Sequence, residues 1–326
     1  MIFQILLAFI ERIRPAVLVL FLSVFIPLLG GCSSFSTIKK ATTGMIHNMS
    51  APDSHLKKKV GIALFENKTT VTDQKFNDVF ADYLLGAITK ECSDILLVKP
   101  GDAEYPDYLA ELPKQAAGRI DSFELAQRGR QLGLNAIVTG ALIDISENRE
   151  KKGILWFKRT HEYVRVKVAV AVYETETGAK ILDESFNQKI DVGESDFDPE
   201  FDSPGPKKQI DKQTLTNAYE KIASDMGEAV CNAVADQPWR GFLASINDNK
   251  ILISSGNRVG LKQGDMLDVF DTSNVFQNAL GQRFFIPGLK TGEVKITAVS
   301  ADTAEAEIVS GEGDKIKPGD SLRLKE

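Results

Sequence analysis

The sequence predicts an α+β protein in which a mixed-sheet α/β domain is followed by a small all-β barrel of SH3-like or similar type. Two patterns support this. Strand and helix signals alternate from Lys58 to about Asp236, and beyond Pro238 Gly- and Asp-containing turns recur every eight to twelve residues. The length of 326 residues fits two domains, which we place at residues 58–236 and 239–326.

The first half of the α/β domain carries the signals of parallel strands. Short apolar runs at 60–65 and 95–98 predict strands buried on both faces. Apolar residues with helical spacing predict a helix over 76–88, and Asp121 and Gly133 predict the start and end of another. Residues 136–145 predict a third strand.

The second half carries antiparallel signals. Valine occupies every second position from Val164 to Val172, which predicts a strand covered on one face. A turn at 176–178 and a returning strand over 181–192 follow. Residues 212–235 predict a long helix, with a line of small residues from Ala223 to Ala235 well away from its apolar stripe.

The carboxy-terminal region contains one sequence pattern twice. A strand, a Gly turn, a K-x-G-D turn and a short strand occur once around Asp265 and again around Asp320. We expect each aspartate to bond the backbone of its own turn, with Gly264 and Gly319 at positive φ. The metal-ligand interpretation of the two aspartates is the weaker one, and we predict no metal site.

The amino terminus predicts the cellular location of the protein. Charged residues followed by the apolar run 16–29 are typical of a secretory signal peptide, here residues 1–31. The run ends in Leu29-Gly-Gly-Cys32, which resembles the bacterial lipobox. The resemblance implies a diacylglycerol thioether and acylation at Cys32, and Ser33 implies sorting to the outer membrane, facing the periplasm. Residues 32–57 predict a flexible tether.

Several strand and turn stretches resemble known envelope proteins. "KKVGIALFEN", "ILLVKP" and residues 127–140 resemble the amino-terminal domain of Tol-Pal translocation protein B, the curli-secretion lipoproteins and the middle domain of flagellar assembly protein T. "ILISSGNRVGLKQGDMLDVF" and "IKPGD" resemble the carboxy-terminal domain of that flagellar protein. The resemblance implies the two-domain fold, and its motifs concern backbone structure, not chemistry.

Signals for catalysis are missing from the sequence. There is no phosphate-binding G-x-x-x-x-G-K-[ST] and no G-x-S-x-G. A net charge of −6 disfavours nucleic-acid binding. We therefore expect no enzyme activity and no cofactor. Cys92 and Cys231 remain after lipidation, and we hypothesise a disulfide between them; two separate thiols are the alternative.

One apolar cluster stands out between charged flanks. Ile154, Leu155, Trp156 and Phe157 lie between "NREKKG" and "KRT", where we expect the tip of a hairpin. Two interpretations stay open: an exposed contact for a partner, or a strand end folded onto the sheet. The segment is too short for two membrane-spanning strands of about 9–11 residues, so we expect no pore.

These patterns together favour a non-catalytic outer-membrane lipoprotein that binds periplasmic or envelope proteins. We expect it to act as a scaffold or assembly factor for an envelope machine of flagellar or secretion type. The alternatives are an activator of cell-wall synthases and, from another class, a periplasmic hydrolase. A homo-oligomer is a further option, and the sequence leaves the oligomeric state open.

Overall fold

The computed structural model describes residues 55–69, 76–103, 105–154, 157–195, 212–247, 250–311 and 313–325. Residue contacts divide the chain into residues 1–51 and 52–326, and all described residues belong to the second unit.

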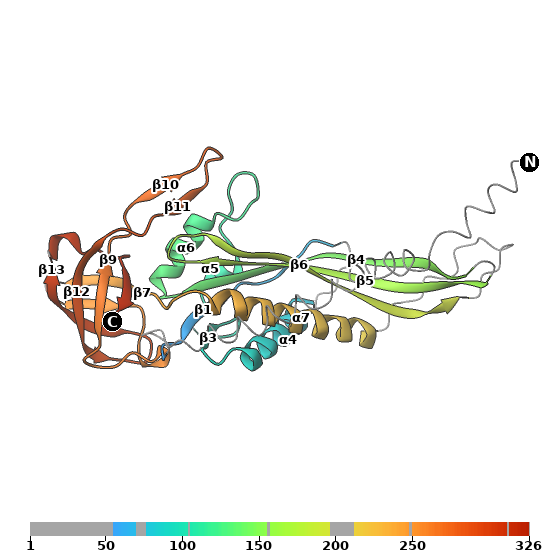
Figure 1. The fold of residues 1–326 in the computed structure, drawn as a ribbon, viewed down its shortest axis with the longest axis horizontal. Helices are drawn as coiled ribbons and strands as arrows, with labels where there is room; N and C mark the ends of the chain where they lie inside the picture. The colour runs from blue at the N-terminus through green and yellow to red at the C-terminus, as the bar shows by residue number, and fades with distance from the viewer. Residues whose placement is uncertain are drawn as a thin grey trace, which may run out of the picture. The chain divides into compact units, whose positions relative to one another are not determined.

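A six-stranded mixed sheet runs through the first part of this unit (Figure 1). Its strands are β1 (Lys58–Ile62), β2 (Glu66–Asn67), β3 (Ile95–Val98), β4 (Ala136–Ile154), β5 (Phe157–Glu174) and β6 (Lys180–Ser195). The order is β3-β1-β4-β5-β6, with β2 paired to β4. The pairs β1–β3 and β1–β4 are parallel, and β4, β5 and β6 form an antiparallel meander. This confirms the predicted mixed sheet.

Helices cover both faces of the sheet. On one face, α4 (Phe76–Glu91) and α7 (Lys212–Ala235) lie side by side (Figure 1). They enclose a hydrophobic cluster to which β5 contributes its alternate valines. Shorter helices, α5 (Asp107–Ala110) and α6 (Ser122–Gln131), contribute to a second cluster that contains the opposite-facing Ile137 and Tyr173. The valine alternation therefore marks the face toward α4 and α7, as the period of two requires.

Local signals set the helix positions. Asp121 caps α6 by accepting a hydrogen bond from the backbone N–H of Glu124 at 3.2 Å, and Gly133 follows the helix at φ 68°. Along α7 the line of small residues faces α4: a Cβ at Gly227 would lie 2.7 Å from that of Ala87. The absence of side chains at this position lets the two helices approach closely.

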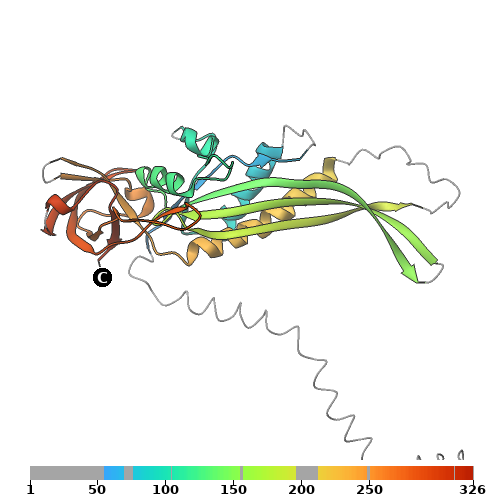
Figure 2. The ribbon, with the colours of Figure 1, turned by 90° about the horizontal axis from the view of Figure 1, so that it is seen from above.

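The meander is longer than the sequence patterns indicate. We expected β4 to stop at residue 145, but it extends to Ile154 and has 19 residues, and β5 has 18. Pairing with β5 continues along the charged stretch 146–153, so backbone hydrogen bonding overrides a composition with low strand propensity. The expectation that this hairpin is too short for two strands of about 9–11 residues is therefore wrong. Figure 2 shows the strands of the meander continuing beyond the amino-terminal end of α7.

The carboxy-terminal part forms a closed six-stranded antiparallel barrel, which confirms the predicted small barrel. Its strands are β7 (Gly241–Asn247), β8 (Lys250–Ile253), β9 (Met266–Phe270), β12 (Lys290–Val299), β13 (Ala304–Gly311) and β14 (Ser321–Leu324). Between β9 and β12, β10 (Val275–Gln277) and β11 (Arg283–Phe285) form a separate hairpin. Trp239, next to the expected domain boundary, is buried in the barrel core.

Both K-x-G-D turns have the expected geometry. Asp265 accepts a hydrogen bond from the N–H of Lys262, and Asp320 accepts one from the N–H of Lys317, each at 2.8 Å. The glycines between them, Gly264 and Gly319, have φ values of 95° and 93°. These aspartates are therefore turn-forming residues.

The tether prediction is wrong at its end. Leu56 is only 2% exposed and packs in the barrel core, and the N–H of Lys57 donates to the carbonyl of Val259 at 2.8 Å. A short apolar contact too small to produce a periodic pattern thus fixes residues 56 and 57 to the barrel. The remainder of the expected signal peptide and tether, up to residue 54, lies outside the described residues.

An ion-pair cluster joins the barrel to the sheet. The carboxylate of Glu176, in the turn between β5 and β6, accepts hydrogen bonds from Arg240 Nε at 2.8 Å and Arg323 Nη2 at 3.0 Å. Beside it, the guanidinium of Arg130 lies 3.6 Å from the ring centre of Phe285. Burial lowers the pKa of Arg130 to about 10, although the acidic Glu176 opposes this effect.

Candidate functional site: the edge of strand β3

The two edges of the mixed sheet differ in charge. Strand β6 carries charged side chains along its length: Lys180, Asp183, Glu184, Lys189 and Asp191. Strand β3 is Ile-Leu-Leu-Val and carries none. Charges on an edge strand discourage pairing with another chain. The edge that lacks this protection is β3, and its four side chains are only half-buried, whereas we expected a strand buried on both faces.

The alternating direction of the hydrogen bonds along β1 shows which backbone groups of β3 face outward. The N–H of Lys58 donates to the carbonyl of Asp94 at 2.8 Å, while Lys59 bonds on the opposite side to Asn135. In a parallel pair successive residues alternate in this way. Leu96 and Val98 therefore direct their N–H and C=O groups toward β1, and Ile95 and Leu97 direct theirs away from the sheet.

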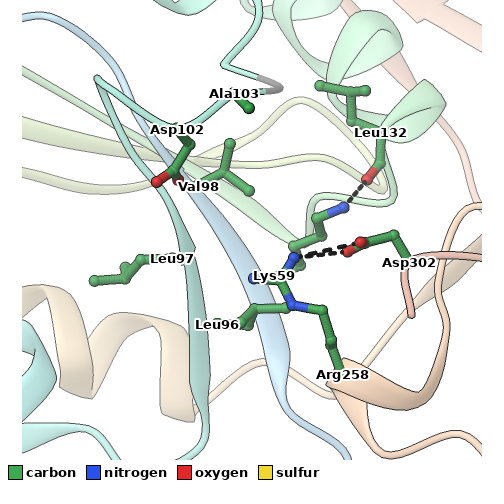
Figure 3. Close-up of a pocket in the computed structure, with 9 residues that line it drawn as sticks. All are labelled: Lys59, Leu96, Leu97, Val98, Asp102, Ala103, Leu132, Arg258 and Asp302. Atoms are coloured by element: carbon green, nitrogen blue, oxygen red, sulfur yellow. Dashed lines mark hydrogen bonds and ion pairs between the residues drawn. The ribbon is translucent and has the colours of Figure 1, made fainter.

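A cavity of about 350 Å³ lies on one face of this edge (Figure 3). Leu96 and Val98 line it together with Leu132, which follows α6, and with Arg258 and Asp302 of the barrel. Leu96 also packs against the barrel core. This cavity therefore lies where the sheet, α6 and the barrel meet.

A second cavity, of about 420 Å³, is lined by Ile95 and Leu97 together with the α4 residues Leu85 and Ile88. Ile95 and Leu97 pack against the α4–α7 cluster. Because successive side chains of a strand point to opposite faces, the two cavities lie on opposite sides of β3. Leu97 borders both.

The cavities differ in their charged groups. In the first, Lys59 Nζ donates to the carbonyl of Leu132 at 3.0 Å, and Arg258 pairs with Asp302 at 3.1 Å, as the dashed lines in Figure 3 mark. With Asp102, two cations face two carboxylates, so the first cavity is balanced.

The second cavity has an excess of positive charge. Arg258, which pairs with Asp302, borders this cavity as well. Lys57 and Lys99 also line it, against the single carboxylate of Asp102, which accepts a hydrogen bond from the backbone N–H of Lys99 at 2.9 Å. The side chains of Lys57 and Lys99 are exposed. An acidic group would therefore be favoured on this side.

A disulfide borders the second cavity. Cys92, just after α4, is bonded to Cys231 of α7, with their Cα atoms 5.8 Å apart. The structure thus contains the pairing hypothesised from the sequence. It links the end of α4 covalently to α7 and so fixes one wall of the cavity.

The other sequence-derived site residues are Cys32 and the apolar cluster 154–157. Cys32, Leu155 and Trp156 lie outside the described residues. The structure gives the backbone of Ile154 and Phe157, which pair with each other at the end of the β4–β5 hairpin. The apolar run 95–98 predicts a strand but does not predict its place at an edge, because pairing partners are set by distant segments.

Two kinds of site are absent from the described ranges. No group of three or more His, Cys, Asp or Glu side chains is placed to hold a metal ion. No helix in these ranges has the length and apolarity needed to cross a bilayer.

Comparison with known proteins gives similar structures at low sequence identity. A hypothetical protein, CT253 from Chlamydia trachomatis, is 13% identical, covering 56% of this chain and 99% of its own, with a TM-score of 0.36. Lipoprotein GNA1162 from Neisseria meningitidis is 10% identical, covering 55% and 99%, with a TM-score of 0.30. The PelC dodecamer from Paraburkholderia phytofirmans is 14% identical, covering 52% and 86%, with a TM-score of 0.27.

No protein-family model matches the chain, and no curated protein matches it.

Proposed function

We propose that this protein is a non-catalytic lipoprotein, anchored through Cys32 to the outer membrane, whose periplasmic body binds envelope proteins. In this role it is a scaffold or assembly factor for a machine of flagellar or secretion type. The observation that carries the proposal is the uncharged edge of β3 between two cavities, because exposed apolar strand edges favour association with other polypeptides. The Leu29-Gly-Gly-Cys32 motif supports the anchor.

The anchor is tested by labelling cells with radioactive palmitate. We expect label in the full chain, none in Cys32→Ala, and accumulation of the unprocessed form with globomycin, which blocks lipoprotein signal peptidase. Cys92→Ser is a matched control that keeps the motif and should stay labelled. A wild-type chain that never takes up palmitate would refute the anchor.

The scaffold role is tested by photo-cross-linking in the living cell. A cross-linking amino acid at Leu97 should capture a defined envelope protein, and one at Glu184 on the charged β6 edge should not. Capture of a cell-wall synthase would replace the assembly role with synthase activation. Turnover of esterase, phosphatase or glycosidase substrates by the purified protein, lost on mutation of Asp102, would replace it with hydrolysis.

A further inference from the structure

We infer that the partner presents an extended segment that adds to the sheet as a new strand beside β3, with apolar side chains alternating with acidic ones. This inference rests on the proposed protein-binding function and specifies how the binding takes place. It requires a free set of backbone groups, room for side chains on both faces and a charge pattern that selects the occupant. The described residues provide all three.

The backbone requirement is met by Ile95 and Leu97. Their N–H and C=O groups point away from β1, because the hydrogen bonds of Lys58 and Lys59 show that successive residues alternate in direction. No hydrogen bond to these outward groups is found within the described ranges of the chain. An added strand would pair with two N–H and two C=O groups, which is the main-chain contact that provides affinity in strand addition.

The side-chain requirement is met by the two cavities. Neighbouring residues of an added strand point to opposite faces of the sheet. Every second side chain would therefore enter the 350 Å³ cavity beside Leu96, and the intervening ones would enter the 420 Å³ cavity beside Ile95. A cavity on only one face would not produce this alternating selection.

Charge then selects the chemistry of each position. In the first cavity the charges balance and the remaining lining includes Leu96, Val98 and Leu132, so apolar side chains fit there. In the second, Lys57 and Lys99 face the single carboxylate of Asp102, so carboxylates fit there. A second copy of this chain would bring only apolar side chains through its own β3 and no carboxylate for the second cavity. In addition, Lys57 and Lys99 of the two copies would repel each other.

The test uses the purified mature chain in detergent and a fluorescent octapeptide of alternating valine and glutamate. We expect saturable binding by fluorescence anisotropy. An octapeptide of alternating valine and lysine, a block-ordered peptide of identical composition, and a version N-methylated at every second residue in each of the two registers should all bind at least tenfold more weakly. Equal binding of the block-ordered and alternating peptides would overturn the alternation.

Two substitutions probe the contacts separately. Among the backbone donors of β3, Leu97→Pro removes only the outward N–H of residue 97. Pro is tolerated where the N–H of an edge strand faces away from the sheet. Relative to Leu97→Ala, which matches the loss of the side chain, it should weaken binding about fivefold, as expected for one net hydrogen bond. Lys99→Glu should weaken binding of the glutamate peptide and improve binding of the lysine peptide.

Hydrogen exchange locates the new strand. On adding the glutamate peptide, the amides of Ile95 and Leu97 should exchange at least tenfold more slowly, whereas those of Leu96 and Val98, already bonded to β1, should change little. Protection confined to other segments would overturn the inference. If Leu97→Pro does not fold, the exchange data and the N-methylated peptides still decide the matter.

The outcomes separate this inference from the proposed function. Specific cross-linking of an envelope protein from Leu97, without amide protection or preference for the alternating peptide, would refute strand addition and leave the scaffold role standing. Binding and protection by the peptide in a chain that never becomes lipidated would support strand addition and refute the lipid-anchored role.

Discussion

Replacing Glu176 by Gln should loosen the attachment of the barrel to the sheet. The Glu176 side chain is 11% exposed, and its carboxylate accepts hydrogen bonds from Arg240, Arg323 and, at 3.2 Å, Ser321 Oγ. Glutamine keeps the size and one acceptor oxygen but leaves two guanidinium groups without their counter-charge. Removing one partner of a buried ion pair costs about 3–5 kcal/mol.

The expected loss lies at the lower end of that range. Arg323 is 33% exposed, so water partly replaces its lost partner, whereas Arg240 is only 15% exposed. We therefore expect the free energy of unfolding to fall by about 3 kcal/mol, which corresponds to a melting temperature about 5–10 °C lower. Urea unfolding at pH 7, followed by circular dichroism, measures this. The control is Glu184→Gln on exposed β6, expected to change stability by less than about 0.5 kcal/mol.

The same contact predicts a pH dependence. Burial by itself raises the pKa of Glu176, but Arg240 and Arg323 together outweigh burial, and the net pKa is lowered from 4.5. A carboxyl group with a depressed folded pKa contributes stability above its unfolded value and loses it as the pH falls through the folded value. The difference between wild type and Glu176→Gln should therefore be complete at pH 7 and shrink below pH 4.5. Equal stability at pH 7, or a gap that persists unchanged at pH 3, would refute this account of the junction.

Three further predictions concern the core and the turns. In the oxidised mature protein neither Cys92 nor Cys231 should react with an alkylating agent in mass spectrometry, and Cys231→Ser should lower the free energy of unfolding by about 3–5 kcal/mol, because the bond closes a loop across 139 residues. Gly227→Leu should cost more than about 2 kcal/mol in urea unfolding by forcing α4 and α7 apart. Asp320→Ala should destabilise the barrel by about 2 kcal/mol and Asp265→Ala by about 1 kcal/mol, since Asp320 is buried and also accepts a second backbone N–H; equal losses in thermal melts would contradict this ranking.

The features predictable from the sequence are those that neighbouring residues determine. The bounds of α7, the Asp121 cap and both K-x-G-D turns follow from periodicity and turn chemistry within a few positions. The alternating valines likewise identify the covered face of β5 without knowledge of its partners. In each case the free-energy difference between the observed and alternative conformations arises locally.

The features that escaped prediction depend on distant segments. The end of β4 is charged and forms a strand because β5 pairs with it. Glu176 has the sequence context of an ordinary turn residue, and only the fold brings Arg240, 64 positions away, to its carboxylate. The edge position of β3 is a property of the strand order. No pattern within 95–98 distinguishes an edge strand from a central one.

The two cavities beside β3 are held in shape by contacts that do not depend on a bound partner. On one side the disulfide holds the end of α4 to α7, and Lys58 Nζ donates to the last carbonyls of α7, at Val234 and Ala235, at 3.0 and 2.9 Å. On the other side the barrel is fixed through Glu176. A strand that adds to an edge already fixed on both sides avoids much of the entropic cost of ordering it. Loosening either support should therefore weaken peptide binding. Glu176→Gln isolates this effect, because Glu176 lines neither cavity and its substitution leaves the lining side chains unchanged.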